Sequence, residues 1–436
     1  MSEVLLLGIS HKTAPVAVRE RLAFTDAQLP AFLQELVAGE SIREAVAIST
    51  CNRTELYLVV TDAVEAESAA LGALARRAGI RLTELTDVVY APRNCDAARQ
   101  LFRVSSGLDS MIVGESEVQG QVRRAHEAAI AAGTGGPLVN RLFNAALKTG
   151  GRVRAETAIG AGGASVSSVA VDLASEVLGD LSARHVVIIG AGETAELTAS
   201  ALAAKGVRTI FVANRHAGRA RSLAERFGGS VLPLDQLPDQ LEHADMMVAS
   251  TASPHAIVGA EELALVMEAR RGRPLLVLDI AVPRDVEAAC GDLDGVTLVD
   301  IDGLQEVVAR NLDGRSAEAH RAEEIVEDEL ARFASWLSSL DAVPTIRALR
   351  EHGDGIVEQV LAENAGRWEG ATPRDLARIE AIARAVSNRL LHEPTIRLKS
   401  VGHGRQQLAR ELFGLDEGTA DLVDEQDNIR SLRRQA

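Results

Sequence analysis

The chain has 436 residues, of which 47% are hydrophobic and 25% charged, and its formal net charge is −16. This length exceeds what one core supports and predicts two to four domains. The negative charge argues against a protein that coats nucleic acid non-specifically. Cys51, Cys95 and Cys290 lack CxxC spacing, so we expect neither a disulfide framework nor a metal site. With no apolar run of about 18 residues, we expect a cytoplasmic protein without a membrane span.

Residues 1–160 alternate short apolar runs with amphipathic stretches, in the order strand, helix, strand, strand, helix, strand. The expected elements are Val4–Leu7, Asp26–Leu36 behind a Thr25/Asp26 cap, Ala45–Ser49, Leu56–Val60, Val64–Ala78 and Val88–Tyr90. This order is typical of a small ferredoxin-like α+β sheet. Helical patterns fill the rest of the segment and are interrupted at Gly107 and Gly114.

Residues 161–310 alternate helices with near-continuous apolar strands, which are typical of a parallel sheet buried on both faces. The expected strands are Val186–Ile189, Thr209–Val212, Met246–Ala249, Leu275–Asp279 and Val296–Val299. Residues 311–436 show no strand signal. A long helix is expected at Glu318–Leu340, and helical patterns continue past Pro344 and Pro394. An all-α tail of this kind favours dimerisation over a self-contained bundle.

A glycine-rich turn follows the first strand of the middle segment and opens a helix. It consists of Gly190, Ala191, Gly192, Glu193, Thr194 and Ala195. The first glycine permits a tight turn, the second lets the backbone approach a pyrophosphate, and the small sixth residue lets helix and strand pack closely. The next strand ends in Asn214 and Arg215, without the acid that would bind the ribose of NAD. We therefore expect a Rossmann domain that binds NADPH.

Cys51 lies in the polar turn Ser49-Thr-Cys-Asn-Arg-Thr-Glu55 between two apolar strands. Most free cysteines are small buried hydrophobes, but this polar setting suits a reactive thiol better. Arg53 would favour a thiolate or hold a substrate carboxylate. A thiolate and NADPH on one chain predict reduction of a thioester to an aldehyde. A second cluster, Gly107–Glu115 continuing to Gln121, is either a helix–loop–helix corner or a polar pocket wall.

Taken together, these motifs resemble the glutamyl-tRNA reductase family, and the similarity covers nearly the whole chain up to about residue 400. Besides the Cys51 turn, the Gly107 cluster and the Gly190 turn, the matching motifs are Gly8-Ile-Ser-His-Lys-Thr-Ala-Pro15, Leu278-Asp-Ile-Ala-Val-Pro-Arg-Asp285, Pro344-Thr-Ile-Arg-Ala-Leu-Arg350 and Leu390-Leu-His-Glu-Pro-Thr395. The resemblance implies that Cys51 attacks the ester of glutamyl-tRNA. NADPH would then reduce the thioester to glutamate-1-semialdehyde, which begins tetrapyrrole synthesis.

By the same resemblance, residues 1–160 form the catalytic domain, 161–310 the NADP(H) domain, and 311–436 a spinal helix with a dimerisation domain. The expected partners are an aminoacyl-tRNA, a second copy of the chain and, as a further candidate, the downstream semialdehyde aminotransferase. Arg53 would bind the substrate carboxylate. The other residues expected to contact substrate are Thr50, Asn52, Ser110, Glu115, Ser116, Glu117 and Gln121.

The chain departs from the family pattern in its catalytic segment. Gln100 stands where the family usually has a histidine, so any proton-transfer role of that histidine is lost. Glu117 replaces a pocket glutamine with a carboxylate, and Gly151 replaces a lysine. Two alternatives therefore stay open beside the family activity. One is a paralogous reductase of another aminoacyl- or peptidyl-tRNA, and the other is a non-catalytic NADPH-binding partner protein.

Overall fold

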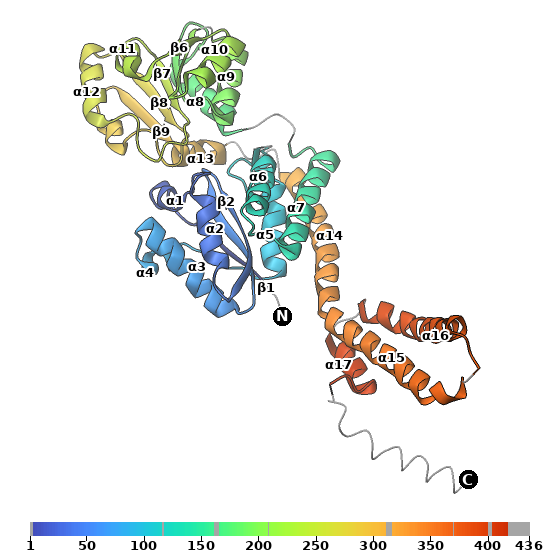
Figure 1. Ribbon diagram of the computed structural model, residues 1–436. Helices are drawn as coiled ribbons and strands as arrows, with labels where there is room; N and C mark the ends of the chain where they lie inside the picture. Colours follow the sequence, from blue (N-terminus) through green and yellow to red (C-terminus); the bar gives the residue numbers. More distant parts are fainter. Residues whose placement is uncertain are drawn as a thin grey trace. The chain divides into compact units, whose positions relative to one another are not determined.

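The computed structural model (Figure 1) describes residues 3–115, 117–160, 165–207, 209–310, 316–368, 370–399 and 403–416. The described residues up to Leu330 form one compact unit, and those from Ala331 onward form a second. The first unit contains two β-sheets, whereas the second is built from helices. In the part of the chain that the structure describes, no helix has the length and apolarity needed to cross a membrane.

A three-stranded antiparallel sheet lies at the centre of the N-terminal part. Its strands, in the order β1-β3-β2, are β1 (Glu3–Ser10), β3 (Arg53–Val60) and β2 (Ile42–Ser49). In place of the strand predicted at Val88–Tyr90, two isolated antiparallel bridges join Tyr90 to Gly8 and Arg93 to Leu5. These bridges occupy the fourth-strand position beside β1, which is the position that the ferredoxin-like order requires.

Seven helices of the described residues accompany this sheet. They are α1 (Val16–Leu22), α2 (Leu29–Val37), α3 (Ala63–Ala78), α4 (Leu82–Thr86), α5 (Cys95–Ser105), α6 (Glu117–Ala131) and α7 (Pro137–Glu156). Helix α3 begins where predicted, because the Asp62 carboxylate accepts hydrogen bonds from the first-turn amides. The cap predicted at Thr25/Asp26 was wrong. A helix that began there would need the N–H of residue 30 to donate to the Asp26 carbonyl, and a proline has no N–H. Helix α2 therefore begins at Leu29.

The loop between α5 and α6 carries several of the polar residues expected in the site. It begins and ends on Gly107 and Gly114, whose φ angles of 74° and 88° are left-handed. The Gly114 amide donates to the Gly107 carbonyl at 2.9 Å and closes the loop. The predicted helix break at these two glycines is therefore confirmed, and Asp109, Ser110 and Glu115 are presented from a closed turn.

The second sheet is parallel throughout its described pairs and has the order β6-β5-β4-β7-β8-β9. Its strands are β4 (His185–Ile189), β5 (Thr209–Ala213), β6 (Ser230–Leu232), β7 (Met246–Ala249), β8 (Leu275–Asp279) and β9 (Val296–Asp300). This is the Rossmann order, in which the chain reverses direction across the sheet between β4 and β7. The five predicted strands are confirmed. The edge strand β6 was missed because it has only three residues, and Ser230 and Val231 are exposed.

Helices flank this sheet and continue beyond it. Around the sheet lie α8 (Val166–Leu178), α9 (Glu193–Ala204), α10 (Ala217–Phe227), α11 (Leu237–Leu241), α12 (Ala260–Ala269), α13 (Ile301–Arg310) and two short 3-10 helices, Leu234–Gln236 and Ala288–Asp292. The C-terminal helices are α14 (Ser316–Asp341), α15 (Val343–Glu363), the 3-10 helix Ala365–Arg367, α16 (Pro373–Lys399) and α17 (His403–Leu412). The long predicted helix is confirmed as α14, and α15 packs against α16.

Candidate functional site

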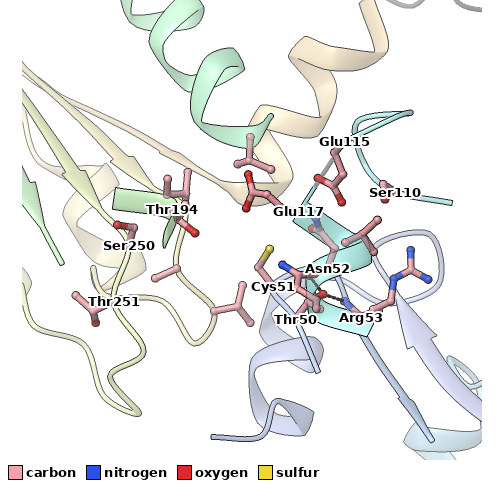
Figure 2. Close-up of a pocket in the computed structure, with 16 residues that line it drawn as sticks. Thr50, Cys51, Asn52, Arg53, Ser110, Glu115, Glu117, Thr194, Ser250 and Thr251 are labelled. Atoms are coloured by element: carbon pink, nitrogen blue, oxygen red, sulfur yellow. Dashed lines mark hydrogen bonds between the residues drawn. The ribbon is translucent and has the colours of Figure 1, made fainter. Parts of the chain in front are cut away.

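One cavity gathers most of the predicted site residues (Figure 2). It lies where the β2–β3 turn, the loop into α6, the start of α9 and the segments after β7 and β8 meet. Its lining consists of Thr50, Cys51, Asn52, Arg53, Ser110, Glu115, Glu117, Val118, Gln121, Val166, Thr194, Ser250, Thr251, Ile280, Ala281 and Val282. The predicted nucleophile thus faces the same space as the first turn of the predicted nucleotide-binding helix. Ser116 lies outside the described residues.

Hydrogen bonds within the β2–β3 turn hold Cys51 at its tip. The Thr50 hydroxyl accepts from the backbone amides of Asn52 and Arg53 at 3.1 and 3.2 Å. The Thr50 amide donates to the Arg53 carbonyl at 2.9 Å. A hydroxyl that accepts from the backbone amides that follow it stabilises a tight turn, so Thr50 holds the backbone that carries Cys51.

The thiol of Cys51 is strongly disfavoured as a thiolate in this setting. Burial, together with the negative charges of Glu115 and Glu117, raises its pKa to about 12. Arg19 partly opposes this effect, and its guanidinium donates to the Cys51 carbonyl. The cysteine is half-buried and carries no disulfide. In the structure described, the thiol therefore needs a base before it can attack a carbonyl carbon.

Arg53 lines the cavity, but its guanidinium is held by a buried ion-pair network. Its guanidinium donates to Glu55 at 2.8 Å, to the Asp109 carboxylate at 3.0 Å, and to the Asp109 carbonyl. The Asp109 carboxylate also pairs with Lys12. Burial alone would raise the pKa of Asp109, but the charges of Arg53 and Lys12 outweigh it and hold that pKa below its usual range. The expectation that Arg53 would favour the thiolate was wrong, because two carboxylates engage its charge.

Glu55 is the centre of this network and is fully buried. One carboxylate oxygen accepts from Arg53, from the Tyr90 hydroxyl at 2.5 Å and from the Gln100 amide at 3.1 Å. The other accepts from the Tyr57 hydroxyl at 2.8 Å. Burial and the nearby Glu55 charge raise the pKa of both tyrosines, so both stay protonated as donors.

Gln100 occupies the position of the family histidine and lies in this network, outside the lining of the cavity. Its amide donates to Glu55 and, at 2.8 Å, to Asp109. A neutral amide can bridge two carboxylates at any pH, but it cannot accept a proton near neutrality. The loss of a proton-transfer group at this position stays a prediction; the structure shows that Gln100 bridges Glu55 and Asp109.

Two carboxylates face Cys51 across the cavity. Burial raises the pKa of Glu115, while the nearby Ser110 hydroxyl and the charges of Arg53 and Arg154 oppose the shift. Burial and the charges of Glu115 and Glu193 raise the pKa of Glu117 to about 7. One carboxylate oxygen of Glu117 is buried without a hydrogen-bond partner among the described residues, as is the Asn52 amide oxygen. These two unpartnered oxygens can accept hydrogen bonds from a bound molecule.

The glycine-rich turn has the geometry that a dinucleotide requires. Gly190 has a φ of 116°, and a Cβ there would lie 2.8 Å from the Ser250 carbonyl oxygen, so only glycine fits. Gly192 precedes α9, and a Cβ at this position would meet nothing within 4 Å, which leaves the backbone open to a ligand. Ala195 is fully buried, as the close packing of helix on strand predicts.

A second hollow lies at the carboxyl end of β5. It is lined by Ile189, Asn214, Arg215, His216, Arg219, Leu234, Thr251, Ala252, Ser253 and Ile257. The predicted pair Asn214 and Arg215 is joined there by Arg219, from the first turns of α10. This lining contains two guanidinium groups and no carboxylate, which suits a phosphate monoester.

Several residues of the two hollows and of the buried Arg53 network were not assigned from the sequence. Glu55 and Asp109 lie inside recognised motifs, but nothing in their spacing shows that they meet Arg53. Ser250 and Thr251 could have been found, because they follow β7, and the ends of parallel strands converge at one edge. Arg219 lies in the first turn of α10, four residues after Arg215 and close to the end of β5, and this proximity in sequence was the available signal. The described residues contain no group of three or more His, Cys, Asp or Glu placed to hold a metal ion.

Comparisons with known proteins give similarity along most of the chain. Family models match at residues 7–157 (glutamyl-tRNA(Glu) reductase, N-terminal domain), 172–307 (shikimate/quinate 5-dehydrogenase) and 321–415 (glutamyl-tRNA(Glu) reductase, dimerisation domain). The chain is 42% identical over 418 residues to glutamyl-tRNA reductase of Pelotomaculum thermopropionicum, covering 95% of this chain and 94% of that protein. The Pseudomonas aeruginosa enzyme of the same name is 42% identical over 419 residues, covering 95% and 98%.

A solved structure is similar over nearly the same length. Glutamyl-tRNA reductase from Methanopyrus kandleri is 30% identical, with a TM-score of 0.51, over 94% of this chain and 97% of that one. The dehydrogenase match over the second sheet indicates a nicotinamide dinucleotide as cofactor. The dimerisation-domain match indicates a homodimer.

Proposed function

Because the chain belongs to the glutamyl-tRNA reductase family, we propose that it reduces tRNA-bound glutamate to glutamate-1-semialdehyde, with NADPH as hydride donor. The observation that carries the proposal is the single cavity that Cys51 shares with Thr194 of the nucleotide-binding turn. A covalent acyl group on the thiol would face the nicotinamide end of a dinucleotide bound at that turn. The full-length similarity favours this activity over the paralogous and non-catalytic alternatives.

The proposed chemistry has two stages. First, the Cys51 sulfur bonds to the ester carbonyl carbon of glutamyl-tRNA, the bond from that carbon to the ribose oxygen breaks, and the ribose oxygen gains a proton. The glutamyl group is then held as a thioester. When bound, NADPH supplies the hydride that converts this thioester to the aldehyde. Cys51 leaves as a thiolate and takes up a proton, which restores the free thiol.

The residues around the Gly190 turn fit the pyrophosphate of a dinucleotide, and those at the end of β5 support NADPH over NADH. Arg215 and Arg219 line the hollow there, and its lining has no carboxylate to bind a ribose diol. A guanidinium makes charge-assisted hydrogen bonds to a phosphate, so a 2′-phosphate would be bound here.

The glutamyl group offers an ammonium, an ester carbonyl and a carboxylate. We place its ammonium toward Glu115, whose carboxylate lines the cavity, and its ester carbonyl toward Cys51 and Glu117. We place its carboxylate toward Arg53, which Glu55 and Asp109 hold in a fixed position. Thr50, Asn52, Ser110 and Gln121 would supply hydrogen bonds along the remaining wall.

We also propose that the protein works in the cytoplasm as a homodimer joined through its C-terminal helices. Apolar side chains on those helices are unusually exposed within one chain: Ile382 by 66%, Leu390 by 70% and Leu412 by 72%. Exposed apolar groups of this kind on a matched dimerisation domain are stabilised by burial against a second copy. The downstream aminotransferase stays a predicted partner.

The direct test incubates the purified protein with NADPH and glutamyl-tRNA and measures aldehyde formation and NADPH oxidation together. Wild type is expected to form glutamate-1-semialdehyde, and Cys51→Ser is expected to form none while still binding NADPH. Charged aspartyl- and glutaminyl-tRNA serve as competitors that test the altered-substrate alternative. If the protein binds NADPH but leaves glutamyl-tRNA unreacted, the proposed substrate is wrong.

A further inference from the structure

We propose that Glu117 is a catalytic residue that takes the proton of the Cys51 thiol and returns it to the ribose oxygen of the departing tRNA. This inference rests on the proposed function. It assigns acid–base chemistry to a carboxylate that stands where the family usually has an amide.

The reaction requires a base in this cavity. Burial and the charges of Glu115 and Glu117 raise the pKa of the Cys51 thiol well above neutrality, so the thiol keeps its proton at neutral pH until a base removes it. The residue at the position of the family histidine, Gln100, cannot accept a proton. It is also held by Glu55 and Asp109 and does not line the cavity. The proton must therefore go to another group.

Three titratable side chains besides Cys51 line the cavity: Arg53, Glu115 and Glu117. Arg53 stays protonated between its two carboxylates and cannot act as a base. Glu115 is only 8% exposed, which leaves it little access to solvent protons. Glu117 is partly exposed, one of its oxygens has no hydrogen-bond partner among the described residues, and it reaches into the cavity toward the Cys51 sulfur (Figure 2). Glu117 is therefore the free acceptor.

His11 is the other nearby candidate, and its geometry excludes it. Its backbone amide donates to the Asn52 carbonyl at 2.8 Å, but its ring does not line the cavity. Burial and the charge of Arg53 lower its pKa to about 4. An imidazole of that pKa is a poor base for a thiol at neutral pH.

The charges around Glu117 suit a group that gains and loses a proton near neutrality. The titratable groups that face it are Glu115 from the preceding loop, Glu193 from α9, Arg124 from its own helix, and Cys51. Arg124 pairs with Glu193 at 3.1 Å, so its positive charge is partly neutralised there and only partly offsets the carboxylates around Glu117. Burial and the two neighbouring carboxylates raise the pKa of Glu117 to about 7. A general base acts most effectively when its pKa lies near the working pH.

Glu117 alone can both accept and return the proton that this step moves. The Glu117 carboxylate accepts the S–H proton as the sulfur bonds to the carbonyl carbon. The bond from that carbon to the ribose oxygen then breaks, and the Glu117 carboxylic acid donates the same proton to that oxygen. Glu117 ends as a carboxylate, the glutamyl group ends as a thioester, and no oxidant or reductant is consumed at this stage.

The test compares wild type with Glu117→Gln, which keeps the shape of the side chain. Glu127→Gln, an exposed position on the same helix, serves as the matched control. Glutamyl-tRNA is mixed with excess protein without NADPH, and formation of the protein-bound thioester is followed from about pH 5.5 to 9. Wild type and the control should show a rising rate with a midpoint near pH 7. Glu117→Gln should be slower by about 10²–10⁴-fold at pH 7 and should lose that midpoint.

A second readout uses no tRNA and separates this inference from the proposed function. Alkylation of Cys51 by iodoacetamide is measured over the same pH range. If Glu117 were only a charged neighbour, its removal would lower the pKa of the thiol and speed alkylation. If it is the base, its removal slows alkylation near neutral pH. Faster alkylation, or an unchanged thioester profile, in Glu117→Gln would overturn the inference. Absence of thioester in wild type would instead overturn the proposed function.

Discussion

Replacement of Glu55 by glutamine tests whether the buried charge network maintains the fold of the N-terminal part. Glu55 is fully buried and accepts hydrogen bonds from Arg53, Tyr57, Tyr90 and Gln100. Loss of one member of a buried ion pair costs about 3–5 kcal/mol. Asp109 still pairs with Arg53 in the variant, so we expect Glu55→Gln to lower the free energy of unfolding by about 2–4 kcal/mol.

The chain provides its own probe for this measurement. Tyr57 and Tyr90 are its two tyrosines, and both donate to Glu55. Second-derivative tyrosine absorbance on heating therefore reports on the network itself. A loss of about 2–4 kcal/mol corresponds to a Tm lowered by about 4–16 °C for a domain of this size.

Glu35→Gln is the matched control, because Glu35 pairs with Arg76 at 3.3 Å on the surface, with side chains 60% and 70% exposed. Such a pair contributes less than about 1 kcal/mol. Equal Tm shifts for Glu55→Gln and Glu35→Gln would refute the reasoning, since burial would then make no difference to the cost of removing a charge.

Two further predictions concern the nucleotide-binding half. Arg215→Ala should raise the KM for NADPH by about 10–100-fold, because it removes a charge-assisted hydrogen bond worth about 1.5–3 kcal/mol, and it should leave the KM for NADH unchanged in steady-state assays. Asp302→Asn removes the charge that pairs with Arg19, whose guanidinium also donates to the Cys51 carbonyl. We expect this variant to lower kcat several-fold. The NADPH dissociation constant, measured by cofactor fluorescence, should stay unchanged. An unaltered kcat would show that the Arg19 contact does not position the thiol.

Much of the fold could be predicted because its signals are local. The strands of the second sheet are buried on both faces, so each is a continuous apolar run that the sequence displays directly. The Gly190 turn could be placed because the strand, the glycines and the helix follow one another without a gap. The edge strand β6 could not, because its three residues are defined by pairing with β5. The start of α2 was predictable from Pro30, whose missing N–H the Thr25/Asp26 cap signal left out of account.

The sequence predicted which residues line the candidate site, but it did not predict which of them form ion pairs and hydrogen bonds with one another. The turn of Cys51 and the Gly107–Glu115 loop were both expected in a pocket, and they do line one cavity. The pairing of Arg53 with Asp109 joins residues far apart in the chain, and no periodicity encodes it. The sequence left Arg53 either to favour the thiolate or to hold a substrate carboxylate, and it did not show that Glu55 and Asp109 pair with the guanidinium.

The two departures from the family pattern, Gln100 and Glu117, can be explained together, because one lies in the buried charge network and the other on the cavity wall. Lys12 and Arg53 carry two positive charges against Glu55 and Asp109, so the network is neutral overall, and the amide of Gln100 bridges its two carboxylates without adding a charge. A histidine at that position would gain a proton beside Arg53 as the pH fell, and the network would then carry a net positive charge. The amide of Gln100 does not titrate, so it holds the two carboxylates without taking up a proton. If Glu117 is the base, as inferred above, proton transfer takes place on the cavity wall and the positioning of Arg53 in the buried network, so the two tasks belong to different residues.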